Sequence, residues 1–528
     1  MALDAQKMET DKAIKRILIR GVNWIGDGVL TTPAIKNIRR AYPDSHISLL
    51  VKPWVSGLFE NNPDIDELIT YEKRHEGFLG KIQLVRELRK RRFDTAILLQ
   101  NAFDAALIAF LSGIPERIGY SRDARGVLLT KQVRYEGDDR RIHHVDYYLN
   151  LLKAAGIAIE YLQPSSPWIY LSLKERLLAR ETLKGLKRPI IGINPGAAYG
   201  SAKRWMPERF AWVAGRIIDE LGGSVVIFGG PLEVEMAEKI CKSADIEHLN
   251  PNHGPISLLN MVGKTTIREL AAFISECDAM VTNDSGAMHI GYAVGTPLVC
   301  IFGSTDPALT GPPINGNSIV IKKDIECSPC FERKCRKGNL LCMDLITSDE
   351  VFDAVKRLIP QNKAVFFDRD GTLCRDVGYL NRMEDLEIFP EVKSLTRLKE
   401  KGFFLIGISN QSGIARGMVD EDLVRKVNNI FIERYGFDGF YYCPHHPDEH
   451  CPCRKPEPRM LYKARADYRI DLKKSFVVGD KDSDMIFAKA VGATGILVKT
   501  GEAKEPKSAD YTVEAMKEAV DFIINQEL

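Results

Sequence analysis

The sequence is poor in several features that would place a protein in a class at once. It has no apolar run long enough to span a bilayer, and its first residues are polar rather than a hydrophobic leader. The 73 Lys and Arg residues nearly balance the 71 Asp and Glu residues, which leaves a net charge of +2. Such a balance gives no general argument for nucleic acid as a partner. We therefore expect a cytoplasmic protein without a transmembrane segment, for which a peripheral position at a membrane surface stays open.

A dinucleotide-binding fingerprint is also missing. Gly21, Gly26 and Gly28 follow the first expected strand, but their spacing does not fit GxGxxG. No acidic residue clearly stands where such a site needs one to hold a ribose. The pattern therefore disfavours a dehydrogenase.

What the sequence does contain is a regular alternation of strand and helix patterns over 528 residues, 45% of them hydrophobic. The length suggests about three domains, and the alternation predicts an α/β protein whose parallel sheets are covered on both faces. We place two Rossmann-like domains at 1–160 and 188–358, facing a cleft, and a third at 362–528. The stretch 157–187, which includes Pro164, is interpreted as a linker.

The stretch from Ala364 to Leu373 organises the last third of the chain. Four apolar residues lead directly into Asp368 and Asp370, which predicts a buried strand with two carboxylates at its carboxyl end. An aspartate there can attack phosphorus if a cation offsets the charge of both partners. A second acid two positions on can protonate the leaving oxygen. We expect Asp368 to be the nucleophile and Asp370 the acid–base.

Three further elements of phosphoryl chemistry follow in the chain. A strand ends at Ser409 and Asn410, a pair of cations stands at 454–455, and another strand ends at Asp480. Magnesium prefers oxygen ligands and substrate phosphate, so we expect Asp368, Asp370 and Asp480 to hold Mg²⁺. A helix cap could explain any one element but not all four together. The expected substrate-binding and catalytic side chains are Ser409, Asn410, Arg454, Lys455 (catalytic) and Lys481.

Seven of the eleven cysteines fall in two clusters, which in a reducing compartment indicates thiols or metal ligands rather than disulfides. The pattern Cys-x-His followed closely by Cys-x-Cys predicts a zinc site at Cys443, His445, Cys451 and Cys453. The second cluster has irregular spacing, and a structural metal, reduced thiols and disulfides all stay open for it. Its members are Cys327, Cys330, Cys335 and Cys342.

The first two domains carry less specific motifs. Asp27 stands between the first strand and a helix, where it can either cap the helix or act as a general base. Asp284, Ser285 and Gly286 open a helix after a strand, and the free amides of such a helix start can bind phosphate. His289 lies one turn further on and can face the same ligand.

Two more residues point to a nucleotide ligand. Lys203 ends a loop of small residues that begins at Gly196, and a lysine there can offset the charge of a diphosphate leaving group. Glu233 follows the turn Gly229-Gly230-Pro231. It can hold a ribose hydroxyl, or it can simply be an acid at a helix N-terminus.

Residues 16 to about 358 resemble the ADP-heptose:lipopolysaccharide heptosyltransferases, which have the GT-B fold. The matching motifs are Gly-Ser-Ala-Lys-Arg-Trp at 200–205, Val-Thr-Asn-Asp-Ser-Gly-Ala-Met-His at 281–289 and Phe-Gly-Ser-Thr-Asp-Pro at 302–307. The resemblance implies that Asp27 deprotonates the acceptor hydroxyl and that Glu233 holds the nucleoside. It implies a diphosphate site made by Lys203, Ser285, Gly286 and His289.

The four elements of the third domain resemble the haloacid dehalogenase superfamily. The loop at 443–453, Gly378-Tyr379 and the stretch 410–417 resemble the D-glycero-D-manno-heptose 1,7-bisphosphate 7-phosphatases within it. In that family the zinc orders a loop beside the residues matching Arg454 and Lys455 and does no chemistry. The related histidinol phosphatases share this scaffold and give the alternative substrate class.

Both resemblances point to heptose. They imply a bifunctional enzyme of lipopolysaccharide inner-core assembly, with ADP-heptose, heptose bisphosphate and a core acceptor at the inner membrane face as partners. The competing hypothesis is a nucleotide-sugar-binding scaffold with an inactive transferase half, fused to a histidinol-phosphatase-like enzyme.

Overall fold

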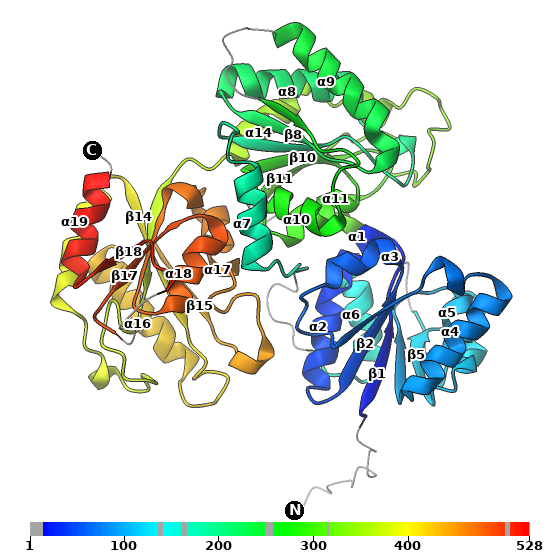
Figure 1. Ribbon diagram of the computed structural model, residues 1–528, viewed down its shortest axis with the longest axis horizontal. Coiled ribbons are helices and arrows are strands. Elements are labelled where there is room, and N and C mark those ends of the chain that lie inside the picture. Colours follow the sequence, from blue (N-terminus) through cyan, green and yellow to red (C-terminus); the bar gives the residue numbers. More distant parts are fainter. Residues whose placement is uncertain are drawn as a thin grey trace, which may run out of the picture. The chain divides into compact units, whose positions relative to one another are not determined.

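The computed structural model describes residues 14–135, 141–159, 166–248, 257–313, 316–501 and 507–526 (Figure 1). The chain forms two compact units. One extends to Ile169 and includes Ala308–Thr310 from α12 (Pro307–Thr310), and the other contains Tyr170–Pro307 and Gly311–Leu528. Three six-stranded sheets, all parallel, confirm the α/β class.

The first unit holds one sheet, with strand order β3-β2-β1-β4-β5-β6. Its strands are β1 (Arg16–Arg20), β2 (His46–Val51), β3 (Glu67–Thr70), β4 (Thr95–Leu98), β5 (Glu116–Tyr120) and β6 (Lys131–Val133). Its helices are α1 (Ile25–Leu30), α2 (Thr32–Ala41), α3 (Pro53–Ser56), α4 (Gly77–Arg91), α5 (Phe103–Leu111) and α6 (His144–Ala154), with 3₁₀ turns η1 (Gly57–Phe59), η2 (Lys73–His75) and η3 (Gly126–Leu128).

The stretch 23–28, which contains Gly26 and Gly28, is largely helical, because α1 already begins at Ile25. Gly28 is needed there for packing rather than for chain reversal: a Cβ on it would lie only 3.0 Å from Val55 and 3.1 Å from Leu58. The following helix, α2, has Pro33 in its first turn, as expected for a residue without a backbone N–H.

The second unit contains two sheets. The first has the order β12-β11-β10-β7-β8-β9. Its strands are β7 (Ile190–Asn194), β8 (Ser224–Ile227), β9 (Leu258–Asn260), β10 (Ala279–Asn283), β11 (Leu298–Phe302) and β12 (Ser318–Lys322). The helices are α7 (Leu173–Thr182), α8 (Pro207–Leu221), α9 (Val234–His248), α10 (Ile267–Glu276), α11 (Gly286–Ala293), α13 (Leu341–Asp344) and α14 (Ser348–Leu358), with 3₁₀ turns η4 (Ser201–Lys203) and η5 (Pro231–Glu233).

The second sheet of this unit has the order β15-β14-β13-β16-β17-β18. Its strands are β13 (Lys363–Asp368), β14 (Phe403–Asn410), β15 (Gly439–Cys443), β16 (Phe476–Gly479), β17 (Thr494–Val498) and β18 (Tyr511–Val513). The helices are α15 (Thr396–Glu400), α16 (Glu421–Tyr435), α17 (Arg459–Tyr468), α18 (Asp482–Val491) and α19 (Met516–Gln526), with 3₁₀ turns η6 (Met383–Asp385), η7 (Pro390–Leu395), η8 (Pro447–Glu449) and η9 (Leu472–Lys474).

The central strands of each sheet are buried on both faces, which is why they read as continuous apolar runs in the sequence. In the third sheet, β13 lies between β14 and β16, and its Val365 and Phe367 belong to the core. Because all neighbours are parallel, the strands of a sheet end at one edge, and the loops that follow can place polar groups together there.

Part of the expected linker is a structured element of the second unit. Residues 160–165 lie outside the described residues, but α7 packs against α10 and α18. A capping box between Ser172 and Glu175 starts this helix.

Among the described residues, no helix combines the length and the apolar character needed to cross a membrane.

Candidate active sites

In the third sheet, three buried carboxylates meet at the strand ends. Asp368 ends β13, Asp480 follows β16, and Asp484 lies in the first turn of α18. One oxygen from each lies within 4.8 Å of the others, and the three residues are at most 5% exposed. A set of oxygen ligands with this charge fits a hard divalent cation such as Mg²⁺.

Glycines make room for this cluster. Gly371 has φ +93°, and a Cβ on it would come within 2.5 Å of the Asp480 carboxylate. A Cβ on Gly479 would come equally close to Asp484. A side chain at either position would displace a carboxylate, and Gly371 also adopts a backbone conformation that favours glycine.

Lys455 provides the positive charge next to the cluster. Its Nζ lies 2.7 Å from an oxygen of Asp368 and 2.7 Å from one of Asp484. Burial acts to lower the pKa of Lys455, but the two carboxylates outweigh it and raise that pKa. One ammonium does not compensate three acids: burial, followed by the charge of Asp484, raises the pKa of Asp368 to about 8 despite Lys455.

The Asp370 carboxylate, expected to join the metal ligands, is held by other partners. It accepts hydrogen bonds from Arg369 Nε at 3.0 Å, Gln411 Nε2 at 2.7 Å and Ser409 Oγ at 3.1 Å. Burial acts to raise the pKa of Asp370, but Arg369, Gln411 and Ser409 together lower it. Its side chain therefore lies beside Ser409 rather than in the group of three acids.

A cavity of about 780 Å³ is lined by Asp368 and Asp370 together with the other side chains expected at this site: Ser409, Asn410, Arg454, Lys455 and Lys481. Asn410 exchanges two hydrogen bonds with the backbone of Lys455, at 3.1 and 3.4 Å, and so fixes the position of that cation. Lys481 donates to Asp376 at 3.0 Å. The cations of the cavity lining are Arg369, Arg375, Arg454, Lys455 and Lys481.

Two members of the site were missed from the sequence. Asp484 stands four residues after Asp480, a spacing that places it one helical turn away, but an acid in a first helical turn is also an ordinary feature. Gln411 follows Asn410 and showed no signal of its own, because its role depends on where Asp370 points.

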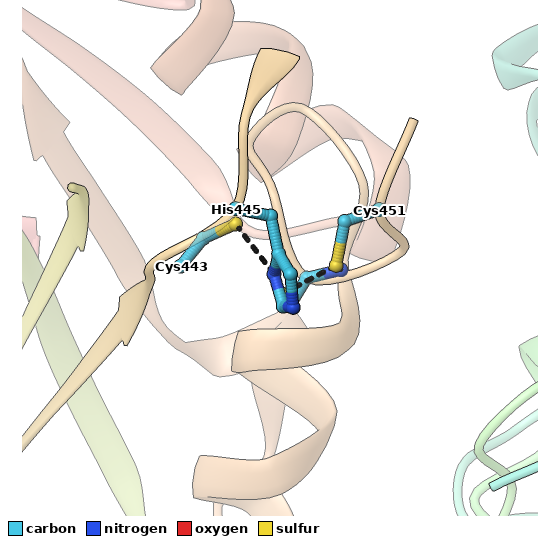
Figure 2. A group of neighbouring side chains, drawn as sticks. Cys443, His445 and Cys451 are labelled. Carbon is cyan, nitrogen blue, oxygen red and sulfur yellow. Dashed lines mark hydrogen bonds between the residues drawn. The ribbon is translucent and has the colours of Figure 1, made fainter. Parts of the chain in front are cut away.

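The predicted zinc ligands converge in the loop after β15. Figure 2 shows Cys443, His445 and Cys451 pointing toward one another. The Nδ1 atom of His445 lies 3.4 Å from Cys443 Sγ and 3.2 Å from Cys453 Sγ, and one donor atom from each of the four residues lies within 4.8 Å of the others. Three cysteine sulfurs and one histidine nitrogen are ligand types that Zn²⁺ takes in tetrahedral sites, although the Cys451 and Cys453 sulfurs, 2.7 Å apart, would have to separate to bind one ion.

The second cysteine cluster, at 327–342, does not bring its thiols together as the first one does. All eleven cysteines are free, and no three of the thiols of Cys327, Cys330, Cys335 and Cys342, all within the described ranges, lie within 4.8 Å of one another. Their loop contacts the Lys203 loop instead. Tyr199 Oη donates to the Phe331 carbonyl at 2.7 Å, and the Ala202 amide donates to the Arg333 carbonyl at 3.1 Å.

In the first unit, Asp27 lies inside α1 and does not cap it. The N-cap is Trp24, and no side chain there makes a capping hydrogen bond. The Asp27 carboxylate lies 3.6 Å from His144 Nδ1 on α6, with both side chains about one-third exposed. Burial, with a smaller contribution from Asp27, raises the pKa of the neighbouring Tyr148. The Asp27 carboxylate is thus partly accessible and lies beside an imidazole.

In the second unit, Lys203 and Asp284 form an ion pair. Lys203 Nζ lies 2.5 Å from Asp284 Oδ2 and 4.5 Å from the centre of the Tyr199 ring. Asp284 also accepts a hydrogen bond from Thr305 at 2.6 Å. The predicted substrate-binding residue Asp284 therefore holds Lys203 in position at the start of α11.

The other expected residues gather at the same edge of the sheet. Ser285 is the N-cap residue of α11, makes no side-chain cap and receives a 3.3 Å hydrogen bond from Asn194 at the end of β7. Gly286 is the first residue of α11, and His289 lies one turn in and is buried. Glu233 accepts from the Gly230 amide at 2.8 Å, and its carboxylate lies against Gly196, where a Cβ would clash with it.

Comparisons with known proteins agree with both halves of this description. Residues 81–341 match the sequence profile of glycosyltransferase family 9 (heptosyltransferase), and residues 452–525 match that of the HAD-like hydrolases. Lipopolysaccharide heptosyltransferase 2 of Escherichia coli K12 is 30% identical over 357 residues, which is 66% of this chain and the whole of that protein.

The last part of the chain has relatives of its own. The D-glycero-beta-D-manno-heptose-1,7-bisphosphate 7-phosphatase of Haemophilus ducreyi is 39% identical over 178 residues, which is 30% of this chain and 98% of that protein. Among solved structures, the ADP-heptose lps heptosyltransferase II of E. coli covers 65% of this chain and 98% of its own length, with 28% identity and a TM-score of 0.55. The chain thus belongs to the family 9 heptosyltransferases and carries, fused to that GT-B-like part, a HAD-like domain of the heptose-bisphosphate 7-phosphatase family.

Proposed function

We propose that this chain is a bifunctional enzyme of lipopolysaccharide inner-core heptose metabolism. One half transfers heptose from ADP-heptose to a lipopolysaccharide core acceptor, and the other hydrolyses the 7-phosphate of D-glycero-D-manno-heptose 1,7-bisphosphate. The observation that carries the proposal is that each half keeps its own set of reactive groups: Asp27 and Lys203 in one, and Asp368, Asp370 and Lys455 in the other. An inactive transferase scaffold would have no need to keep the first pair.

In the phosphatase, an oxygen of Asp368 attacks the phosphorus of the 7-phosphate and forms an aspartyl phosphate. The bond from phosphorus to the sugar oxygen breaks, and that oxygen takes a proton from Asp370. The pKa of Asp370 is lowered in the free protein, and the negative charge of the bound phosphate would raise it so that Asp370 holds this proton. Water then cleaves the aspartyl phosphate, with Asp370 accepting its proton. Mg²⁺ bound by Asp368, Asp480 and Asp484 would offset the charge of the acids and of the phosphate.

The cavity around these acids supports the substrate class. Ser409 and Lys481 line this cavity and would bind the transferred phosphate, and Arg454 and Lys455 would bind anionic oxygens. A volume of about 780 Å³ with five cations in its lining suits a sugar that carries two phosphates. The related phosphatases are named for the β anomer, and we propose the same anomer here.

In the transferase, Asp27 takes the proton of the acceptor hydroxyl while the acceptor oxygen bonds to the anomeric carbon of heptose. The bond from that carbon to the diphosphate oxygen breaks and ADP leaves. Lys203, Ser285, Gly286 and His289 would hold the diphosphate, and Glu233 the ribose. Since Asp284 pairs with Lys203 in the free protein, the incoming diphosphate competes for this cation.

The relatives suggest which heptose is added and where. Those matching the transferase half are named heptosyltransferase 2, so we assign the same step to this chain. The proposed location is cytoplasmic, at the inner membrane face where the acceptor is displayed. Zn²⁺ bound in the 443–453 loop has a structural role in this proposal.

The test is to measure both rates on two variants. Asp368→Asn keeps the shape but removes the anionic nucleophile, so phosphate release should fall by about 10³-fold or more while heptosyl transfer continues. Asp27→Asn should lower heptosyl transfer by about 10²–10⁴-fold and leave ADP-heptose binding intact. Circular dichroism checks that both variants are folded. If the wild-type protein releases no phosphate from heptose bisphosphate or transfers no heptose, the corresponding half of the proposal is wrong.

A further inference from the structure

Helix α4 presents a mixed apolar and basic face to solvent. Phe78 and Leu79 in its first turn are 80% and 79% exposed. At 100° per residue, Arg86, Arg89 and Lys90, all exposed, fall within about 120° of arc with these two side chains. The opposite face of the helix, from Gly80 to Leu88, is buried. Apolar residues and cations on one exposed face are typical of a helix that lies on a membrane surface.

Helix α5 extends this face with an almost wholly apolar stripe. Phe103, Phe110 and Leu111 are 43–47% exposed and lie on one side of the helix. The two helices pack together: Arg89 donates to the Leu111 carbonyl at 2.5 Å, and Lys81 on α4 pairs with Asp104 on α5 at 2.5 Å. Their exposed sides therefore form one continuous surface.

One further cation, Arg117, and one more apolar side chain, Val127, border this surface. The Arg117 guanidinium lies 5.3 Å from the centre of the Phe110 ring. Val127, in the η3 turn that contacts α5, is 85% exposed. The acids nearby are already paired, Asp104 with Lys81, and Glu87 with Arg74, His75 and Gln83. We call the following set the α4–α5 face: Phe78, Leu79, Arg86, Arg89, Lys90, Phe103, Phe110, Leu111 and Val127.

The α4–α5 face reaches the edge of the sheet that carries Asp27. Phe78 lies at the start of α4, which follows β3. Phe103 follows β4 and Val127 follows β5, and Asp27 follows β1 in the same parallel sheet, so all four residues come after the carboxyl ends of strands. Strand β4 is the immediate neighbour of β1. A lipid-anchored sugar presented to Asp27 would thus approach from beside this face.

We propose that the α4–α5 face docks this protein on an anionic lipid surface. The aromatic and leucine side chains enter the interfacial region while Arg86 and Lys90 meet lipid phosphates. An exposed apolar surface of this kind, bordered by cations, is unusual for a protein without such a partner. The inference rests on the proposed function in one respect: the lipid-linked acceptor gives the docking its purpose.

The test measures binding of the full-length protein to vesicles. Wild-type protein should bind vesicles rich in phosphatidylglycerol, bind phosphatidylcholine vesicles weakly, and lose binding as salt is raised. Arg86→Gln/Lys90→Gln should weaken binding by roughly 25-fold, at about fivefold per cation. Phe78→Gln/Leu79→Gln should weaken it by about tenfold or more through lost apolar burial.

A matched control is available on another helix. Leu177 and Leu178 of α7 are also adjacent, apolar and 42% and 61% exposed, so Leu177→Gln/Leu178→Gln should bind vesicles as the wild type does. Unchanged phosphatase activity and circular dichroism show that each variant is folded. Equal binding of wild type and Phe78→Gln/Leu79→Gln would overturn the inference. Sedimentation without lipid gives a second check. If the wild-type protein forms an oligomer that Phe78→Gln/Leu79→Gln dissociates, the inference is also overturned, because the face would then bind a second copy of the chain.

Transfer assays separate this inference from the proposed function. With a core acceptor freed of its lipid, Phe78→Gln/Leu79→Gln should transfer heptose at the wild-type rate, and it should be slower with the acceptor in vesicles. Wild-type protein that binds vesicles but transfers heptose to neither acceptor would refute the transferase and leave the docking surface standing. A variant equally slow with both acceptors would overturn the docking inference, because the face would then serve the reaction itself.

Discussion

At the scale of single residues, burial acts in one direction on every carboxylate, and the neighbouring cations decide the outcome. Asp368 shares one lysine with Asp484, and its pKa rises to about 8. Burial also acts to raise the pKa of Glu175, but Arg268 and Ser172 lower it to about 2. The acids around Asp368 need a divalent cation to ionise together. Glu175 needs no further cation, because Arg268 already compensates its charge.

Glu175 gives a prediction about stability and pH. Its carboxylate receives two hydrogen bonds from Arg268, at 2.7 and 2.8 Å, which join α7 to α10. Since the folded pKa lies below the ordinary value of 4.5, this stabilisation is present above about pH 4.5 and is lost as the pH falls toward 2. Glu175→Gln should lower the free energy of unfolding at pH 7 by about 1.5–3 kcal/mol.

Urea unfolding of wild type and Glu175→Gln at pH 7, 5 and 4 checks this prediction. The difference between them should begin to shrink near pH 4. Glu181→Gln serves as control, because Glu181 lies on the adjoining turn and is exposed in its pair with Lys184. A difference that is the same at every pH would mean that the charge of Glu175 is not what stabilises the contact.

At the scale of elements, the Cys/His loop leads directly into residues that line the phosphatase cavity. The predicted zinc ligands end at Cys453, and Arg454 follows directly. Asn410 at the end of β14 binds both the N–H and the C=O of Lys455. A metal that fixes this loop therefore also fixes two cations of the active site. It can influence the reaction rate without taking part in the chemistry.

We expect purified protein to contain about one zinc and Cys443→Ser to contain much less. Because thiolate ligation is coupled to folding, the variant should also unfold at a lower temperature, and its phosphatase rate should fall. Elemental analysis and thermal unfolding of reduced, unchelated protein measure both effects. Cys327→Ser/Cys330→Ser is the control and should keep the same zinc content, since no three thiols of that group lie within 4.8 Å in the described structure. Zinc lost from the control but kept by Cys443→Ser would reverse the assignment.

At the scale of the whole molecule, the phosphatase sheet is not simply appended by the short connection at 360–363. Arg180 on α7 binds Glu276 through two hydrogen bonds and also donates to the Lys489 carbonyl on α18. Lys473 reaches the same Glu276 at 3.3 Å, and the buried Arg176 donates to Tyr462 at 2.8 Å. These contacts join the sheet formed by β7–β12 to the sheet formed by β13–β18 within one compact unit.

Glu276 is the acid that pairs with both Arg180 and Lys473 where the two sheets of this unit meet, and it is 2% exposed. Burial acts to raise its pKa, but Lys473 and Arg180 outweigh that and lower it. Glu276→Gln would leave two poorly compensated cations, so it should cost about 3–5 kcal/mol of stability. We expect heptosyl transfer and phosphate release to be lost together at a lower urea concentration, with little change in either rate in the absence of urea. Loss of one activity alone would show that the two halves unfold independently.

The sequence by itself determined the α/β class, the strand ends that carry the chemistry and the pattern of the zinc ligands. These are local features: an apolar run, the acids that follow it and closely spaced cysteines all lie within a few residues of one another. Other features needed the tertiary structure. Asp484 joins Asp368 across 116 positions, Asp370 turns to Gln411, and α7 binds a helix about 300 residues further along the chain. Such partners are chosen by packing between distant segments, and no local pattern encodes which of many similar acids and cations will meet.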